Sequence, residues 1–369
     1  MTLGAPDYAS AAPSRATIPL YLGTYTRGRS KGIYIATFDA VSGSVTVDGV
    51  VEGVENPSFL ALDPTRTRLY AVSEVGEFEG TAGGGVVAFA IERDGGLRAL
   101  NRQATHGGAP CQLTVDATGR HLLVANYSGG NVTVLPIRPD GSLGPAAQVV
   151  QHRGSGADPR HQEGPHAHSV TLDAGNRFAA VADLGIDRVM VYRFDAERGR
   201  LDPATPAEVR MTAGAGPRHF DFHPDGRRAY VINELNSTIT ALSYSPETGV
   251  FEPGQSVSTL PAGHAGSNSC ADIHVAPSGR FIYGSNRGHD SIAVFAIAPD
   301  TGELVPVQHQ STLGRTPRNF AIDPAGRFLL AANQDSDSLA VFAIDPQTGT
   351  LSPVGEPVDV PVPVCVRFA

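Results

Sequence analysis

The sequence predicts an all-β protein: a seven-bladed β-propeller with four antiparallel strands in each blade. Two internal repeats and the place of the last strand support this prediction. Both repeats recur about every fifty residues, and a repeat of this length in a strand-rich chain is typical of propeller blades. A β-helix is the alternative architecture, but a period of about fifty residues is too long for one of its turns.

The first repeat is a pair of short strands joined by a tight turn, and Pro217–Glu234 shows it most clearly. Phe220 and Phe222 alternate with polar residues, and the apolar run Ala229–Ile232 follows the turn His223-Pro224-Asp225-Gly226. Equivalent turns begin at Asp63, Asp116, Asp173, Ala276 and Asp323. An arginine follows each turn, and we interpret these arginines as structural because they recur: Arg66 or Arg68, Arg120, Arg177, Arg227, Arg280 and Arg327.

The second repeat is a β-branched and aromatic run followed by a glycine-containing turn. Its seven copies are Gly32–Phe38, Val86–Ile91, Val132–Ile137, Val189–Phe194, Ile239–Tyr244, Ile292–Ile297 and Leu339–Ile344. The first repeat has only six copies, and the missing inner strand lies at the other end of the chain, where Pro363–Ala369 aligns with Pro317–Asp323. We therefore expect the C-terminal strand to join the N-terminal blade begun by Leu20–Tyr25. This pairing closes the ring and protects its edges.

Composition and charge limit the class of protein. Residues 1–17 are predicted to form a disordered tail without the basic start and apolar run of a secretory signal, and residues 18–369 form one propeller domain. No run approaches the roughly 18 apolar residues of a membrane helix, so we expect a cytoplasmic protein that does not bind membranes. The net charge of −9 argues against nucleic acid as a partner but permits a small anionic ligand. The three cysteines have neither metal-ligand nor disulfide spacing, which favours a core role.

Polar residues recur where the inner strands should meet one mouth of the central channel. The position five residues before each turn carries Ser58, Cys111, His168, Arg218, Ala271 and Arg318. The end of the following strand carries Glu74, Asn126 with Tyr127, Asp183, Asn233 with Glu234, Asn286 with Arg287, and Asn333 with Gln334. Turn chemistry explains some of the Asn and Asp residues. It does not explain the remaining charged residues and histidine, which are Arg218, Arg287, Arg318, Glu234 and His166. We therefore predict the functional site at this mouth.

Several chemistries fit these residues. Arg218 and Arg318 share one register and form either salt bridges across the channel or a clamp for a carboxylate or phosphate. Glu234 is either their counter-ion or a general base. His166 and His168 alternate along one strand and face the same side. As metal ligands these histidines would need partners that no spacing supplies, which favours proton handling or hydrogen bonding. No nucleophile elbow supports a serine hydrolase, because the one Gly-x-Ser-x-Gly match, Gly28–Gly32, lies in a chain without long helical periodicity.

Six motifs carry a family resemblance that runs from about residue 18 to the C-terminus. They are Leu22–Thr26, Pro165–Ser169, Gly214–His219, Asn233–Ser237, Ala271–His274 and Pro317–Phe320. With them the sequence resembles the seven-bladed-propeller lactonases, which include bacterial 6-phosphogluconolactonases and are related to fungal carboxy-muconate lactonising enzymes. Gly-Pro-Arg-His followed by Asn-Glu-Leu-Asn-Ser is more specific than a generic propeller repeat.

The resemblance implies a site and a reaction. It points to His166, Arg218, Glu234 and Arg287 as catalytic residues, with His168 as the alternative histidine. We expect Arg318, His168, Asp272 and Asn233 to contact the substrate.

The expected reaction is hydrolysis of 6-phospho-D-glucono-1,5-lactone in the pentose phosphate pathway. Glu234 would activate water, and arginines would hold the oxyanion and the phosphate. We expect no metal or cofactor, and a monomer or weak homodimer. A carboxy-muconate-type lactonising cycloisomerase and a non-catalytic binding scaffold are the alternatives.

Overall fold

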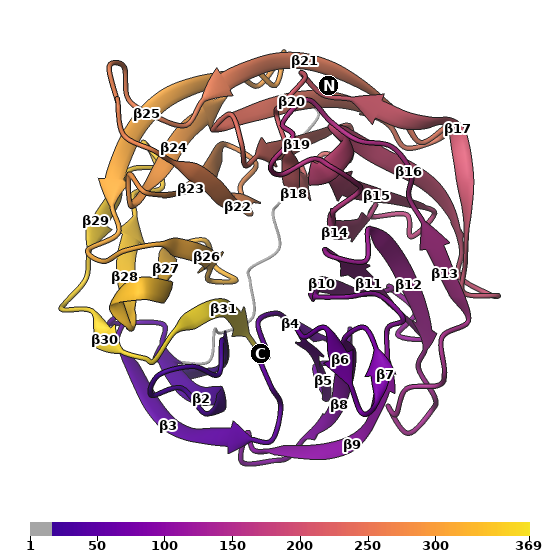
Figure 1. Cartoon of the computed structure of the whole chain (residues 1–369). Helices are drawn as coiled ribbons and strands as arrows, with labels where there is room; N and C mark the ends of the chain where they lie inside the picture. Colours follow the sequence, from indigo (N-terminus) through magenta and orange to yellow (C-terminus); the bar gives the residue numbers. More distant parts are fainter. Residues whose placement is uncertain (1–16) are drawn as a thin grey trace, which may run out of the picture.

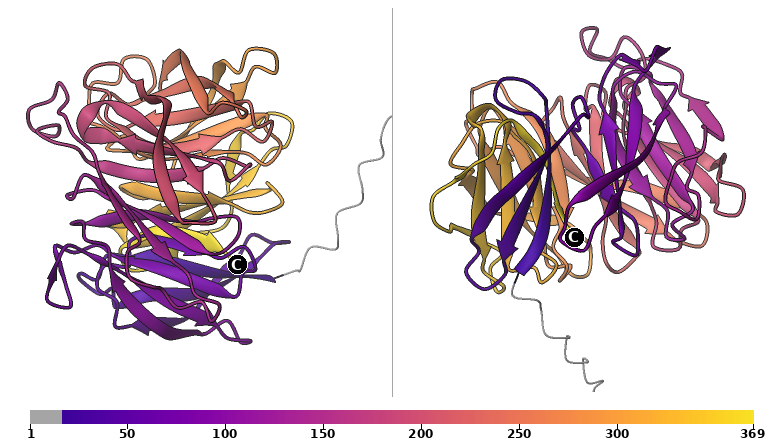
Figure 2. Two further views of the ribbon diagram at one scale, coloured as in Figure 1. Left: turned by 90° about the vertical axis from the view of Figure 1, so that its right-hand side faces the viewer. Right: turned by 90° about the horizontal axis from the view of Figure 1, so that it is seen from below.

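The strands form seven sheets arranged in a ring about a common axis (Figure 1). The structure, a computed structural model, describes residues 17–369. The predicted tail, residues 1–17, lies outside the described residues except for Thr17, which begins strand β1. Seen from the side, the loops between strands gather on the two faces of the ring (Figure 2). Within residues 17–369, no helix has the length and apolar character needed to cross a bilayer.

Each of these sheets is one blade. We number the blades in the order in which their second strands occur along the chain. Blade 1 consists of β31 (Pro363–Phe368), β1 (Thr17–Thr24), β2 (Gly32–Asp39) and β3 (Val45–Glu52). Blade 2 consists of β4 (Leu60–Leu62), β5 (Arg68–Ser73), β8 (Gly85–Ile91) and β9 (Leu97–Ala104), with the small hairpin β6 (Glu77–Phe78) and β7 (Thr81–Ala82) beside it. Blade 3 consists of β10 (Pro110–Val115), β11 (His121–Asn126), β12 (Asn131–Pro136) and β13 (Gln148–Gln151).

The remaining four blades follow the same plan. Blade 4 consists of β14 (Ala167–Leu172), β15 (Phe178–Asp183), β16 (Arg188–Asp195) and β17 (Arg200–Arg210). Blade 5 consists of β18 (Pro217–Phe222), β19 (Arg228–Asn233), β20 (Thr238–Ser245) and β21 (Val250–Ser258). Blade 6 consists of β22 (Ser269–Val275), β23 (Phe281–Arg287), β24 (Ser291–Ile297) and β25 (Leu304–Ser311). Blade 7 consists of β26 (Pro317–Ile322), β27 (Phe328–Asn333), β28 (Ser338–Ile344) and β29 (Leu351–Pro353), with β30 (Val358–Asp359) also on β28. Two single-turn 3-10 helices, Leu184–Ile186 and Gln334–Ser336, follow β15 and β27.

The last strand closes the ring, which confirms the sequence prediction. Strand β31 pairs antiparallel with β1, with Leu20 opposite Phe368 and Leu22 opposite Val366. The backbone N–H of Ala369 adds a hydrogen bond of 2.9 Å to the carbonyl of Pro19. Blade 1 is therefore built from both ends of the described chain, and neither end leaves an open inner edge.

The turns after the inner strands explain the first repeat. Asp116 accepts hydrogen bonds from the backbone N–H groups of Arg120 (2.9 Å) and His121 (2.8 Å), and Asp173 binds its own turn in the same way. The third residue after the start of each turn has a left-handed backbone, with φ of 68° at Gly119 and 65° at Gly226. Glycine is favoured there because a Cβ atom disfavours this conformation.

Hydrophobic cores fill the spaces between neighbouring blades. One cluster joins Val189 and Val191 of blade 4 to Phe220 and Val231 of blade 5. Middle strands such as β11 are buried throughout, whereas outer strands such as β3 are only half-buried. This gradient follows from each sheet being covered on both faces near the axis and reaching solvent at the rim.

The recurring arginines bind the neighbouring blade, which confirms that they are structural. Arg120 donates to the carbonyl of Ala196 (2.9 Å), and Arg327 donates to that of Ala40 (2.6 Å). In blade 5, Arg228 rather than the expected Arg227 has this role, because its guanidinium donates to the carbonyls of Ala298 and Pro299. A second set of bonds runs from buried tyrosine hydroxyls to turn carbonyls: Tyr21 to Gly95, Tyr70 to Gly141, Tyr230 to Gly302 and Tyr283 to Gly349.

Candidate active site

A β-bulge near the start of the inner strand creates the site position in six blades. At these places the pairing of the inner strand with its neighbour skips a residue. The skipped residues are Cys111, His168, Arg218, Arg318, Val364 and, with Asp272 beside it, Ala271. A bulged residue leaves the ladder and its side chain is re-aimed. The positions that repeat alignment selected from the sequence are therefore the places where the backbone turns side chains toward one mouth.

Glu234 lies between two guanidinium groups at this mouth. Its Oε2 atom is 2.8 Å from Nε of Arg218 and 2.9 Å from an Nη atom of Arg287. Burial opposes ionisation, but Arg287, Arg218 and Arg318 together hold the pKa of Glu234 below its ordinary value. Glu234 is therefore a carboxylate at neutral pH, and a weak base while both arginines contact it.

Arg218 and Arg287 are themselves fixed by backbone carbonyls of blade 6. Arg218 donates to the carbonyl of Ala271, and Arg287 donates to that of Cys270 at 2.8 Å. The Arg218 side chain is only 2% exposed, and burial, together with Arg318 and Arg287, lowers its pKa to about 10, so it stays charged at neutral pH. The buried Nε of Arg287 has no hydrogen-bond partner in the described chain, so one donor of this arginine is unsatisfied.

Arg318 has a different environment. Its guanidinium carbon lies 5.4 Å from the centre of the Tyr25 ring, a cation–π contact. Within residues 17–369 no carboxylate is close enough to form an ion pair with it, whereas Glu234 pairs with both other arginines. The Tyr25 hydroxyl donates to the Glu74 carboxylate, with both oxygens at 3.1 Å, and Ser58 donates to the same carboxylate. Arg318 is therefore held by a ring and keeps its charge available for an anionic ligand.

Two histidines lie against Tyr127 on the other side of the mouth. The His166 ring stacks on Tyr127 with centroids 4.4 Å apart, and the His168 ring meets the same tyrosine edge-on at 5.5 Å. His166 donates from Nδ1 to the carbonyl of Tyr127 at 3.0 Å, so its Nε2 carries a free lone pair in the neutral ring. This Nε2 faces Glu163 at 3.5 Å. His166 is thus oriented as a base or hydrogen-bond acceptor at the mouth.

His168 differs from His166 although both were predicted from one motif. It is buried, and its Nδ1 contacts the Cys111 thiol at 3.6 Å. Burial first, and then the positive charge of Arg218, hold its pKa well below the ordinary value. His168 is a neutral wall residue, and the geometry favours His166 as the reactive histidine.

Asp272 lies deeper and its oxygens are occupied. Oδ1 accepts from Nδ1 of His219 at 2.6 Å, and Oδ2 accepts from Nε2 of His274 at 3.1 Å and from the amide of Asn319. These partners hold the pKa of Asp272 well below its ordinary value although burial opposes this. The predicted substrate contact is not kept, because Asp272 binds three strands of the wall together.

Asn233 is also not brought to the mouth. Its amide donates to the hydroxyls of Thr238 (2.9 Å) and Thr240 (3.0 Å) inside its own blade. Asn126 makes the equivalent bond to Asn131 in blade 3. The recurrence of asparagine at this register therefore reflects turn stabilisation, and we do not keep Asn233 as a substrate ligand.

Tyr25, Glu74 and Tyr127 were not included among the predicted site residues. All three occupy the position directly after the second strand of a blade, as Glu234 does, and Arg287 ends the second strand of blade 6. Burial first, and then the charge of Glu234, raise the pKa of Tyr127 to about 12, which places its ring in the field of the same carboxylate. The comparison of this register in the sequence had placed Glu74 and Tyr127 at the mouth without assigning them a role, and extending it to the N-terminal blade would have added Tyr25. In the described part of the chain, no three His, Cys, Asp or Glu side chains are placed to bind a metal ion.

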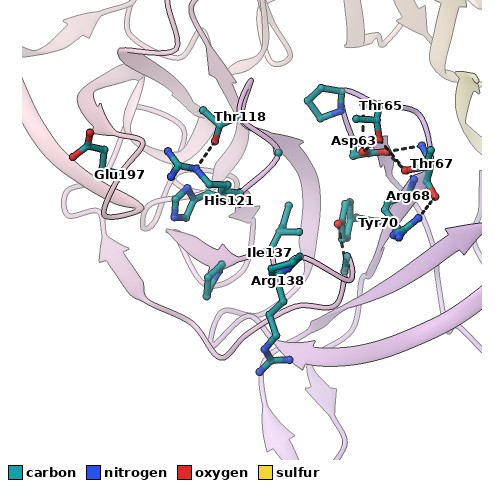
Figure 3. Close-up of a pocket in the computed structure, with 16 residues that line it drawn as sticks. Asp63, Thr65, Thr67, Arg68, Tyr70, Thr118, His121, Ile137, Arg138 and Glu197 are labelled. Carbon is teal, nitrogen blue, oxygen red and sulfur yellow. Dashed lines mark hydrogen bonds between the residues drawn. The ribbon is translucent and has the colours of Figure 1, made fainter.

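A separate cavity of about 560 Å³ lies at the opposite end of the inner strands. Figure 3 shows its lining, with Asp63, Thr65 and Thr67 on one side and Thr118 and His121 on the other. The arginine Arg68 and the hydroxyl of Tyr70 in its wall already bind carbonyls of blade 3. The cavity is a groove between blades 2 and 3, whereas Glu234 and the two arginines that contact it lie at the other end of the inner strands.

The whole architecture agrees with one protein family. The family model described as "Lactonase, 7-bladed beta-propeller" matches residues 19–368. The chain belongs to this family. It is an enzyme of the lactonase class, a hydrolase, and the interpretation as a non-catalytic scaffold does not hold.

Individual members of this lactonase family are similar to the chain over almost its full length. The 6-phosphogluconolactonase of Bacillus subtilis is 38% identical over 349 residues, which are 94% of this chain and 97% of that protein. A 6-phosphogluconolactonase of Formosa agariphila is 31% identical and covers 82% of this chain and 86% of its own. The structure of a periplasmic gluconolactonase of Pseudomonas aeruginosa superposes with a TM-score of 0.90 at 38% identity, over 95% of this chain and 99% of that one.

Proposed function

We propose that this lactonase hydrolyses 6-phospho-D-glucono-1,5-lactone to 6-phosphogluconate, as part of the pentose phosphate pathway. The relatives support hydrolysis of a sugar lactone. Preference for the phosphorylated sugar and the roles of single residues are our assignment. The observation that supports this assignment is the arrangement of charges at the mouth. Glu234 forms ion pairs with two arginines, and in the described chain the third arginine, Arg318, has no carboxylate partner.

The free arginine suits the phosphate. A phosphate monoester carries about −1.5 to −2 charges at neutral pH, and a guanidinium group matches its oxygens in a planar fork. Arg318 is held by a ring contact rather than by a carboxylate, so it can bind an anion without breaking an ion pair. The lactone carbonyl would then lie toward Glu234 and Arg287.

The charges around Glu234 change which residue we expect to accept the proton from water. From the sequence, Glu234 was expected to draw the proton from water. Its lowered pKa makes it a poor proton acceptor, whereas Nε2 of His166 makes no hydrogen bond and has only Glu163 near it, at 3.5 Å. We therefore assign proton abstraction from water to His166. Glu234 then holds Arg218 and Arg287 in position, and Glu234 as base remains the second assignment.

The reaction follows from these positions. Water adds to the lactone carbon as its proton passes to Nε2 of His166, and we assign the guanidinium group of Arg287, which contacts Glu234, to stabilise the negative charge that develops on the carbonyl oxygen. A donor in this role contributes about 3–4 kcal/mol to the transition state. The bond from this carbon to the ring oxygen then breaks, and the ring oxygen takes the proton back from His166. The resulting acid ionises and releases one proton to solvent.

The test is proton release at neutral pH from freshly prepared 6-phosphogluconolactone and from glucono-1,5-lactone, with the spontaneous decay subtracted and with and without EDTA. We expect rapid turnover with preference for the phosphorylated lactone. Turnover of neither, together with activity on a carboxy-muconate, would overturn the proposal in favour of the cycloisomerase.

A second experiment separates the two candidate bases. With His166 as base, His166→Gln should remove most of kcat together with the acid limb of the pH–rate profile. With Glu234 as base, the acid limb should survive in His166→Gln, because the pKa of Glu234 lies below 4.5. Exposed Glu247→Gln is the matched control, and should show the wild-type profile.

A further inference from the structure

Glu74 is a carboxylate at the mouth that the mechanism does not use. Within residues 17–369 it makes no ion pair, and its oxygens accept from the hydroxyls of Tyr25 and Ser58 instead. The donors to Glu74 are therefore neutral hydroxyl groups, whereas two arginines contact Glu234 and offset its charge.

Glu74 and Arg318 are coupled through one aromatic ring. The guanidinium carbon of Arg318 lies 5.4 Å from the centre of the Tyr25 ring. The hydroxyl of the same tyrosine donates a hydrogen bond of 3.1 Å to the Glu74 carboxylate. The tyrosine therefore separates two opposite charges that would otherwise be free to pair directly. Arg318 stays available for a ligand, but its attraction for an anion is reduced by the carboxylate behind the ring.

The charge balance of the mouth follows from these contacts. On the arginine side of the mouth, Arg218, Arg287 and Arg318 supply three positive charges, and Glu234 and Glu74 supply two negative ones, so these five groups sum to +1. Glu163, on the His166 side, is a further carboxylate. A phosphorylated lactone brings about −1.5 to −2 charges. Glu74 therefore opposes the second charge of a phosphate while leaving an uncharged lactone almost unaffected.

We propose that Glu74, held by Tyr25 and Ser58, is a specificity-determining residue that limits the preference for phosphorylated substrate and lets the enzyme accept unphosphorylated aldonolactones as a second substrate class. This inference rests on the proposed lactone hydrolysis at the same mouth. Glu74 acts through its field on the bound anion rather than by touching the reacting carbon. It differs from Arg318, which makes the direct contact with the anionic end.

The test is the ratio of kcat/KM for 6-phosphogluconolactone to that for glucono-1,5-lactone. Glu74→Gln keeps the size of the side chain and an acceptor for one hydroxyl, and should raise the ratio at least about tenfold, chiefly through a lower KM for the phosphorylated lactone. The matched control is Glu197→Gln, an exposed change in the wall of the cavity in Figure 3, which should leave the ratio unchanged. A ratio within twofold of wild type in Glu74→Gln would overturn the inference.

A second variant keeps the inference testable if Glu74→Gln does not fold. Tyr25→Phe removes one of the two hydroxyls that hold the carboxylate, leaving that of Ser58, and keeps the ring beside Arg318. Glu74 is then free to pair with Arg318, so the ratio should fall, in the direction opposite to Glu74→Gln. A rise in the ratio would contradict the charge arrangement.

Binding of products separates this inference from the proposed function. Calorimetry with 6-phosphogluconate and with gluconate needs no turnover, and Glu74→Gln should bind 6-phosphogluconate more tightly than wild type while gluconate affinity changes less. If wild type hydrolyses neither lactone but this binding shift appears, the proposed reaction fails and the charge role stands. If both lactones are hydrolysed and no shift appears in either experiment, the charge role fails alone.

Discussion

Replacing Glu234 by glutamine tests the central charge arrangement. The change keeps the shape of the side chain but removes the negative charge that Arg218 and Arg287 share at 2.8 and 2.9 Å. Both arginine side chains are largely buried, at 2% and 14% exposure, so neither can replace the lost partner with bulk water. We expect Glu234→Gln to lower both stability and activity.

The size of the effect follows from the geometry. Charge centres about 4 Å apart attract by about 4 kcal/mol at an effective dielectric constant of about 20, and removing one partner of a buried pair costs about 3–5 kcal/mol. Because Glu234 is 20% exposed, we take the lower end, about 3 kcal/mol. At about 2.1 cal/mol/K per residue for about 350 residues, the unfolding entropy is about 0.74 kcal/mol/K. The melting temperature should therefore fall by about 4 °C.

The pH dependence of this difference has a definite sign. The pKa of Glu234 is held below 4.5 in the fold, so its contribution is present above the unfolded-state value and is lost as pH falls through the folded-state value. Thermal unfolding of wild type and Glu234→Gln should differ by the same amount from about pH 6 to 8 and converge below about pH 4.5. The lactonase assay should show a loss of about 10²–10³-fold in kcat/KM, since the arginines lose their fixed positions.

A double variant distinguishes lost charge from general damage. Adding Arg287→Met to Glu234→Gln removes one of the two repelling guanidinium groups, so it should recover part of the stability but none of the activity. Wild-type melting together with turnover within about twofold of wild type in Glu234→Gln would refute the reasoning.

Three further predictions concern other parts of the propeller. Arg318→Met should raise KM for 6-phosphogluconolactone about tenfold in steady-state kinetics with little change in melting temperature, since Arg318 forms no ion pair in the described chain; an equal KM for both lactones in wild type would contradict a phosphate contact. Burial raises the pKa of Asp221 to about 6, so its ionisation penalty grows as pH rises from 3.8 through that value, and Asp221→Asn should raise stability by about 1 kcal/mol at pH 8 but not at pH 3.5 in urea titrations. Tyr70→Phe removes the 3.0 Å bond to the Gly141 carbonyl between blades 2 and 3 and should cost about 1 kcal/mol in the same titrations; no change would show that packing alone joins these blades.

The fold could be predicted because each blade repeats its chemistry. Turn aspartates such as Asp116, left-handed glycines such as Gly119 and the alternation in Phe220–Phe222 are local signals that act within a few residues. The ring closure by β31 was visible because Pro363–Ala369 lacks a partner in its own repeat and aligns with Pro317–Asp323.

The site was harder to predict because its contacts cross blades. Register alone selected Arg218, Glu234, Arg287 and Arg318, but not which arginine pairs with the carboxylate. The environment of Asp272 depends on His219, His274 and Asn319 from three inner strands, and no spacing within one repeat encodes that convergence. Tyr25 and Arg318 lie at opposite ends of the sequence and meet only because the ring closes.

The bulges give this protein a set of structurally equivalent side-chain positions around the mouth. Each bulged residue projects from the same backbone feature, so Val364 and Ala271 occupy places equivalent to those of Arg218 and Arg318. Single substitutions at these bulge positions can therefore change the substrate range, while the turns, the hydrophobic cores and the hydrogen bonds between blades stay the same. For engineering, a small library confined to Val364 and Ala271 would place new functional groups on strands next to those of the existing arginines, without changing the contacts that keep the ring closed.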